Sequence, residues 1–181
     1  ALRDRFSGLS RAEIEALPAV QAYNAYYKPF KKTYHVQLQL ESIAFKGKSI
    51  PSVAALVEAM FMAEIKNQLL TAGHDLERLQ LPVTLDVAQG TEQYTLMRGQ
   101  EQVLKAGDMF MANGLGILSS ILYGPDQRSQ ITPETRNALF TVYAPPGIAA
   151  ETVQAHLEDL RDNILLIAPQ AEVLALQVFR T

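Results

Sequence analysis

The chain has 181 residues, of which 48% are apolar, and its 16 basic side chains are slightly outnumbered by 19 acidic ones. This composition suffices for a hydrophobic core, and the acidic balance argues against wholesale nucleic-acid binding. Cysteine is absent, which excludes disulfides and zinc–thiolate sites. No apolar run approaches the ~20 residues of a membrane span, and the first residues lack a secretory hydrophobic region. We therefore expect a cytoplasmic protein with no membrane contact.

The first third of the chain is predicted to be helical. Ser10 and Glu13 have capping-box spacing, which predicts a helix that begins at the next residue after the serine. Pro18 suits a first helical turn, so a second helix is expected over Pro18–Tyr27. The segment Tyr34–Phe45 shows both strand-like and helix-like spacings, and we favour a helix there. Apolar side chains spaced by three and four residues predict a further helix over Ser52–Leu70.

The middle of the chain alternates apolar and polar residues over short stretches, which is typical of strands. Gly73 is expected to end the preceding helix as a left-handed cap, and Asp75–Leu79 is expected to add one turn. A last helix is predicted over Ala150–Ile167. Strands are predicted over residues 83–87, 93–97, 109–112, 116–122, 138–143 and 172–179. Helices at both ends and antiparallel strands between them indicate the α+β class. We expect one domain over 1–181, with 1–25 as an N-terminal helical extension.

The stretch between two apolar strands has the composition of a ligand site. Gly116–Leu122 runs into the polar turn Gly124–Ser129, and the apolar strand Ala138–Tyr143 follows. Apolar walls with a few polar groups at one end are typical of small-molecule pockets. We therefore expect these strands to be neighbours, with Gly124, Asp126 and Thr141 near one pocket. An ordinary hairpin connection remains the alternative.

Few residues suggest catalysis. The three histidines are far apart in the sequence and lack metal-ligand spacing, so neither a metal nor a cofactor is predicted. His74 beside Asp75 is the one titratable pair that could act near neutral pH. Gly124 is a second weak catalytic candidate, because backbone N–H groups around it could stabilise an oxyanion.

Basic residues gather in one short segment that aromatic residues interrupt. A segment of this kind can contact nucleic-acid phosphates, although a solvated helix face is the alternative. The candidate RNA-binding residues are Lys28, Lys31, Lys32, Lys46 and Lys48.

Many weak matches in one order resemble a known family, the B3/B4 module. They include Leu56–Phe61, Gly73–Leu76, Val83–Ala88, the turn Gly124–Ser129 and the segment Ile131–Asn137. The module is the tRNA-editing domain of phenylalanyl-tRNA synthetase β subunits and also occurs as free-standing proteins. The resemblance covers roughly 26–146. It implies a B3/B4-like α+β fold, a pocket for an aromatic aminoacyl group, and tRNA as the partner.

The sequence departs from the family pattern at several positions. Where the family typically has a polar pair, this chain has Met60 and Phe61, and the family histidine falls on Ala72, two positions before His74. The acidic residue that helps to read a tyrosine hydroxyl falls near Thr141. The residues predicted to bind substrate are Met60, Phe61, His74, Gly124, Asp126, Ser129 and Thr141.

Two functions follow as hypotheses. The first is a trans-acting hydrolase of mischarged aminoacyl-tRNA. The second is a non-catalytic module that binds tRNA, an amino-acid-like ligand or a partner protein. The sequence makes no prediction of the oligomeric state.

Overall fold

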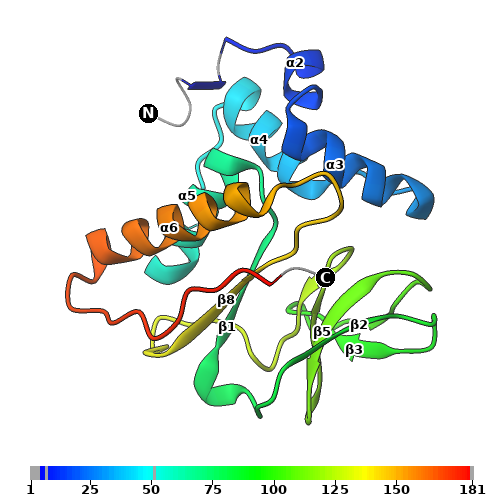
Figure 1. Cartoon of the computed structure of the whole chain (residues 1–181), viewed down its shortest axis with the longest axis vertical. Helices are drawn as coiled ribbons and strands as arrows, with labels where there is room; N and C mark the ends of the chain where they lie inside the picture. The colour runs from blue at the N-terminus through cyan, green and yellow to red at the C-terminus, as the bar shows by residue number, and fades with distance from the viewer. Residues whose placement is uncertain (1–4, 7, 51, 180–181) are drawn as a thin grey trace. The chain divides into compact units, whose positions relative to one another are not determined.

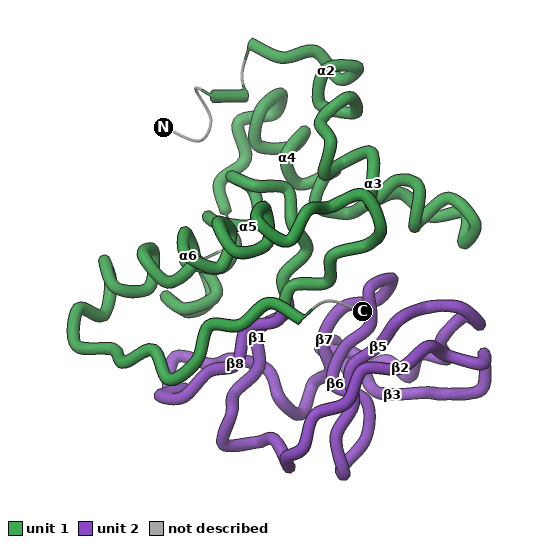
Figure 2. The backbone as a smooth tube through the Cα atoms, viewed as in Figure 1, with its two compact units in different colours: residues 1–71, 142–181 green, residues 72–141 purple. Residues whose placement is uncertain are grey.

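The computed structural model describes residues 5, 6, 8–50 and 52–179, and it combines helices with antiparallel sheets (Figure 1). The predicted α+β class is confirmed. The chain forms two compact units, one from residues 1–71 with 142–181 and the other from 72–141 (Figure 2). We call them the helical unit and the strand unit. One B3/B4-like domain with 1–25 as an extension stays a prediction.

The helical unit contains the predicted helices at nearly the expected positions. Ser10 caps the first of them, and both hydrogen bonds of the capping box with Glu13 are present. The helices are α2 (Arg11–Glu15), α3 (Pro18–Tyr27), the 3₁₀ turn η1 (Lys28–Phe30), α4 (His35–Lys46), α5 (Ala55–Asn67) and α6 (Ala150–Ile167).

Helix α5 ends earlier than predicted, and its left-handed cap is Gln68, not Gly73. Gln68 has φ +54°, and its side-chain amide donates to the carbonyls of Ile65 at 2.9 Å and Lys66 at 2.8 Å. These bonds satisfy two of the carbonyls at the helix end that have no partner within the helix. A glycine cap satisfies such carbonyls through backbone N–H groups alone. Gly73 lies inside a strand instead.

Three buried tyrosines, Tyr23, Tyr27 and Tyr34, lie together in the helical unit. The rings of Tyr23 and Tyr34 stack with centroids 4.2 Å apart. The Tyr23 hydroxyl accepts from the backbone N–H of Leu70 at 2.9 Å and donates to the carbonyl of Tyr143. The Tyr34 hydroxyl donates to the carbonyl of Gln68 at 3.0 Å. Burial is the main cause that raises the pKa of both phenols, so they remain neutral hydrogen-bonding groups that fix the chain at its entry to and return from the strand unit.

The strand unit holds three small sheets. Strand β2 (Thr84–Val87) pairs with β5 (Met109–Asn113), which pairs with β6 (Gly116–Ser120), and β6 pairs with the short β7 (Gly124–Pro125). A second sheet pairs β3 (Gln93–Thr95) with β4 (Glu101–Val103), and a third pairs β1 (Thr71–Asp75) with β8 (Ala138–Val142). Between β1 and β2 lies the 3₁₀ turn η2 (Leu76–Arg78).

Apolar side chains from several strands form the core of this unit. Ala88, Tyr94, Leu104 and Phe110 are buried together, and Ile117 packs against them. The β5–β6 ladder shifts register between Met111 and Ala112, which marks a bulge. The core therefore holds β5 and β6 against the β3–β4 hairpin.

Three expectations about strands are wrong. Strand β4 is absent from the predicted strands. The strand after the central turn does not pair with β6, because β8 pairs with β1. Residues 172–179 alternate like a strand but form none, and Leu174 and Phe179 there are more than 80% exposed. A pattern of alternation identifies a strand only when a partner edge is available.

Among the described residues, none of the helices combines the length and the apolar character that crossing a bilayer requires.

Candidate functional site

A buried chain of polar side chains lies between β1, β6 and the turn after β7. His74 of β1 is completely buried, and its Nδ1 lies 2.7 Å from the hydroxyl of Ser129. The other ring nitrogen, Nε2, lies 3.3 Å from the hydroxyl of Ser119. Ser129 also donates to the carboxylate of Asp126, and its backbone N–H bonds the same oxygen at 3.1 Å. Three of the predicted ligand residues, His74, Asp126 and Ser129, therefore form one network.

The pKa of His74 shows that it is a neutral residue of this network. Burial, together with the nearby Arg128 guanidinium, lowers the pKa of His74 to about 4. A neutral imidazole has one N–H donor and one acceptor nitrogen, and hydroxyl groups of Ser119 and Ser129 face both. His74 therefore has the properties of a positioning group, and a base that titrates near neutral pH needs a higher pKa.

The suggested pairing of His74 with Asp75 does not occur. Successive strand residues point to opposite faces, and the Asp75 carboxylate accepts from Thr135 at 2.8 Å and from the N–H of Glu77 at 3.1 Å. Arg78 lies 3.7 Å from the same carboxylate. Asp75 thus fixes the turn η2 and the segment before β8.

Thr141 lies on the same sheet face as His74. Backbone hydrogen bonds from Leu76 to Asn137 and from Tyr143 to Leu70 set an antiparallel register in which Ala72 lies opposite Thr141. Alternation then places Ala72, His74 and Thr141 on one face. The Thr141 hydroxyl is buried and has no hydrogen-bond partner among the residues that the structure describes. An unpaired buried hydroxyl is costly, and such groups are rare in folded proteins.

Gly124 is required by its backbone conformation. Its φ is +82°, in the left-handed region, and a Cβ added there would meet no atom within 4 Å. Its carbonyl accepts from the Tyr94 hydroxyl at 2.6 Å. The space beside Gly124 is thus open, which is compatible with the close approach of a ligand.

Several N–H groups of the central turn already donate within the fold. The Asp126 N–H donates to Leu118 O at 2.7 Å, and the Gln127 N–H donates to Thr95 O at 3.0 Å. With Ser129 bonded to Asp126 as well, the turn has fewer donors for an oxyanion than the sequence suggested. A catalytic role of the Gly124 backbone stays a prediction.

Two residues of the site were missed at the level of sequence. Ser119 lies in a stretch whose composition predicts an apolar strand, and it is buried against His74. Arg128 donates from Nη1 to Leu115 O at 2.6 Å, and its Nη2 lies 3.4 Å from Asp126 Oδ2. The arginine within the turn Gly124–Ser129 was the available signal for a charge beside the aspartate.

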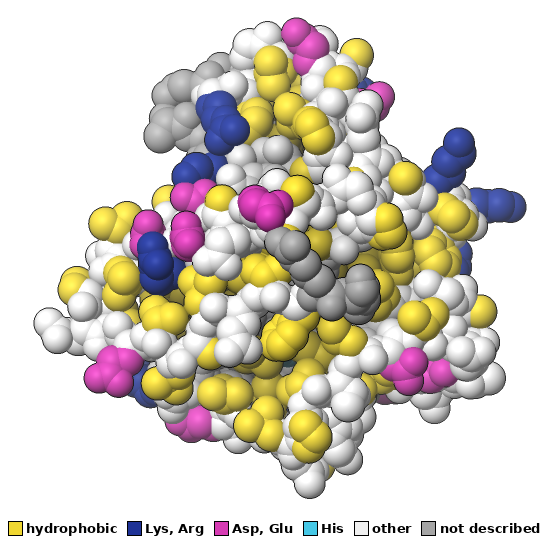
Figure 3. Space-filling view, viewed as in Figure 1, with side chains coloured by type: hydrophobic (Ala, Val, Ile, Leu, Met, Phe, Trp, Pro, Cys, Tyr) yellow, Lys and Arg dark blue, Asp and Glu magenta, His cyan; other side chains and the backbone are white. Residues whose placement is uncertain are grey.

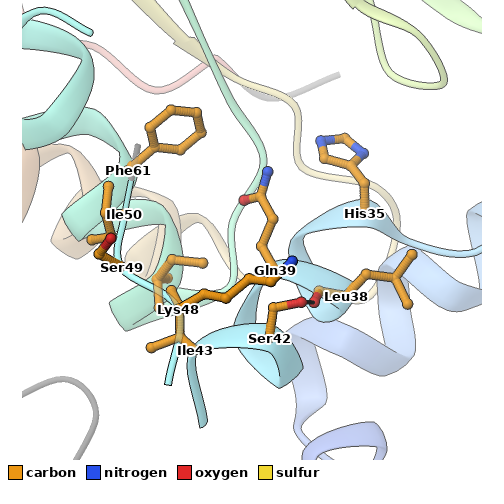
Figure 4. A pocket seen from close by; sticks show the side chains of 10 residues that line it. His35, Leu38, Gln39, Ser42, Ile43, Lys48, Ser49, Ile50 and Phe61 are labelled. Carbon is orange, nitrogen blue, oxygen red and sulfur yellow. Dashed lines mark hydrogen bonds between the residues drawn. The ribbon is translucent and has the colours of Figure 1, made fainter. Parts of the chain in front are cut away.

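The remaining predicted substrate residues belong to the other unit. Met60 and Phe61 lie on α5 in the helical unit, where Met60 is buried. Phe61 lines a pocket there, together with residues of α4 and of the segment that follows it (Figure 4). A direct role for these two residues in the strand-unit site stays a prediction.

The candidate RNA-binding lysines form two groups separated by helix α4. Lys28, Lys31 and Lys32 precede the helix, whereas Lys46 and Lys48 lie at its end. Twelve helical residues span about 18 Å, which is several times the spacing of adjacent phosphates along a strand. On the face shown in Figure 3, basic side chains also occur as separate groups. The lysines therefore offer two contact points and not one continuous patch.

The comparisons with known proteins identify a similarity of fold. No protein-family model matches the sequence, and no curated protein matches it significantly. A solved structure with a similar fold is an N-terminal fragment of the phenylalanyl-tRNA synthetase β subunit from Pyrococcus horikoshii, with a TM-score of 0.53 and 14% identity. The similarity covers 60% of this chain and 38% of that chain, so this chain spans well under two thirds of the fragment. At this identity the similarity concerns the fold alone.

Proposed function

We propose that the chain binds the aminoacylated end of a tRNA in the strand unit and hydrolyses a mischarged aromatic aminoacyl ester there. The observation that carries this proposal is the buried Thr141 hydroxyl without a partner. Thr141 is also the position at which the resemblance to the B3/B4 module places recognition of a tyrosine hydroxyl. The similar fold of a phenylalanyl-tRNA synthetase β-subunit fragment supports the proposal.

The sheet face around Thr141 suits an aromatic side chain with one polar group. A threonine hydroxyl can donate one hydrogen bond and accept others, so a phenol oxygen can satisfy it. Ala72, directly opposite, has only a methyl side chain. A site that hydrogen-bonds a substrate hydroxyl discriminates strongly against an analogue that lacks it. The expected preference is therefore for a tyrosyl over a phenylalanyl ester.

The reaction is the addition of water to the ester carbonyl. The bond between the carbonyl carbon and the tRNA oxygen then breaks, which releases a free amino acid and a tRNA hydroxyl. His74, with a pKa of about 4, stays neutral at pH 7 and contributes by holding Ser119 and Ser129. Catalysis would then rest on the orientation of ester and water, a contribution that can be large without a titrating side chain.

A non-catalytic binding module is the second candidate. It is favoured by the complete burial of His74 and the contacts at both of its ring nitrogens, which remove it as a general base. As a module that binds aminoacyl-tRNA, it shares the ligand of the first candidate and differs from it in the fate of the ester bond.

Single-turnover deacylation of a panel of mischarged tRNAs distinguishes the two candidates. Each substrate is incubated with an excess of the protein, and the remaining ester is measured over time. The hydrolase predicts fastest loss of a tyrosyl ester, a slower loss of the phenylalanyl ester, and a reduced difference in Thr141→Val. Retention of all esters by a protein that binds them indicates the binding module. Neither binding nor hydrolysis contradicts both.

A further inference from the structure

A pocket lies in the helical unit between α4, the segment after it, and α5 (Figure 4). Its volume is about 380 Å³, within the range of small-molecule pockets. One wall is apolar and comes from three elements. It is formed by Leu38, Ile43, Ile50, Phe61 and Ile65.

Most polar side chains that line this pocket are not hydrogen-bonded to other protein groups. Within the described part of the chain, the side chains of Gln39, Lys48 and Ser49 make no hydrogen bond or ion pair. Figure 4 shows the Gln39 side chain extending from α4 into the space between Phe61 and His35. Ser42 donates to Leu38 O at 2.8 Å and keeps its acceptor lone pairs. The pocket thus offers donors that no internal acceptor uses.

The charges of the lining residues indicate that the ligand is negatively charged. Lys48 is the ionised side chain among the lining residues, and none of those residues carries a carboxylate. His35 contributes a neutral ring, because burial, with a smaller effect of Lys32, lowers the pKa of His35 to about 4. Its Nδ1 lies 3.1 Å from the Tyr27 hydroxyl. The pocket therefore presents one cation beside an apolar wall.

We propose that this pocket binds a small apolar monocarboxylate, with the carboxylate on Lys48 and the hydrocarbon body against Ile43, Ile50 and Phe61. The donors of Gln39 and Ser49 supply further hydrogen bonds to the carboxylate oxygens, and such bonds to a charged group are the stronger kind. A free amino acid fits less well, because its ammonium group finds no carboxylate in the lining. The site differs in residues and in ligand class from the aminoacyl site of the strand unit.

Methyl NMR with octanoate as the probe tests this proposal on the whole chain. Three of the lining residues are isoleucines, so labelled isoleucine δ1-methyl groups report on the pocket directly. Octanoate is expected to shift them in a saturable way, while isoleucines of the strand unit serve as internal controls. The reporters are Ile43, Ile50 and Ile65, and the controls are Ile117, Ile121 and Ile131.

Matched ligands and variants test the role of charge. Octylamine has the same chain with the opposite charge, and we expect its Kd to be at least about fivefold higher than that of octanoate. Lys48→Gln should raise the octanoate Kd by up to about fivefold, the upper end of the effect of a solvent-exposed ion pair. Lys46→Gln removes an exposed cation two residues away that does not line the pocket, and it should leave Kd within about twofold.

Three results would overturn the proposal. They are no saturable shift at the pocket methyl groups, equal affinity for octanoate and octylamine, and equal effects of Lys46→Gln and Lys48→Gln. Thermal melts establish that each variant is folded, which is expected because both lysines are exposed.

Discussion

Two threonine-to-valine changes in the strand unit should have opposite effects on stability. Thr141→Val removes a buried hydroxyl that has no hydrogen-bond partner among the described residues. Thr135→Val removes a buried hydroxyl that donates to Asp75 Oδ2 at 2.8 Å and accepts from the Thr132 N–H at 3.0 Å. The chemical change is the same at both positions, so the hydrogen-bond environment decides the sign.

The magnitudes follow from the cost of burying an unpaired polar group. Removal of the Thr141 hydroxyl relieves such a cost, and mutational data place it at about 1–3 kcal/mol. We expect a gain near the lower end, about 1 kcal/mol, because Thr141 is only half-buried as a residue. Thr135→Val leaves a carboxylate oxygen and a backbone N–H short of a partner, which costs about 2 kcal/mol. The two variants should then differ by about 3 kcal/mol.

Urea unfolding followed by circular dichroism measures both free energies. Thr141→Val should move the midpoint to higher urea and Thr135→Val to lower urea, with the slope unchanged. Destabilisation by both variants would contradict this prediction, since it would mean that Thr141 makes a hydrogen bond within the protein. Thr141→Val should also weaken binding of a tyrosyl ester, so that a gain in stability accompanies a loss of ligand affinity.

Other variants test the remaining features of the structure. The pKa values of His35, His74 and His156 are lowered to about 4, mainly by burial, so the unfolded chain binds more protons at these three residues below pH 6.5. The free energy of unfolding should therefore fall as the pH is lowered from 6.5 to 4, by at most about 1.4 kcal/mol per pH unit for each histidine. Burial raises the pKa of Glu64 to about 8, so its protonated form contributes to folding stability below pH 4.5, and this contribution is lost as the pH rises toward 8. Glu64→Gln should abolish this pH-dependent loss of stability in the same urea assay. Gly124→Ala should cost about 1–2 kcal/mol through its positive φ despite the open space beside it, and a cost near zero in a thermal melt would contradict this. In the deacylation assay, His74→Ala should lower the rate by less than about tenfold if the variant is folded, and Gly124→Val by at least about 10²-fold. Salt titration of tRNA binding should show a shallower slope when four lysines become glutamine, and an unchanged slope would exclude phosphate contacts at Lys31, Lys32, Lys46 and Lys48.

The helices of this protein were predictable because their signals are local. The capping box at Ser10, the proline at the start of α3 and the bounds of α6 all appear in the structure as expected. Strand pairing was less predictable, because it depends on segments far apart in the sequence. Residues 71–75 follow a helix and contain a glycine, yet they form a strand because β8 returns beside them.

In the candidate site too, residues within one turn were predictable, whereas contacts between segments far apart in the sequence were not. The composition of the turn Gly124–Ser129 predicts Asp126 and Ser129 as site residues. In the structure Ser129 contacts His74 and donates to Asp126. Ser119 could not be predicted as a site residue, because a serine within an apolar stretch has no distinguishing feature until its hydrogen-bond partner is known. The neutrality of His74 likewise depends on burial and on Arg128, 54 positions further along the chain.

We propose that the strand unit recognises the aminoacyl group itself, and a comparison of two tRNA ligands tests this recognition. One is a tRNA carrying tyrosine through a non-hydrolysable amide bond, and the other is the same tRNA without an amino acid. We expect at least about tenfold tighter binding of the tyrosyl form. Thr141→Val should reduce this difference in affinity, and Lys46→Gln should preserve it. Equal dissociation constants for the two ligands would contradict the claim.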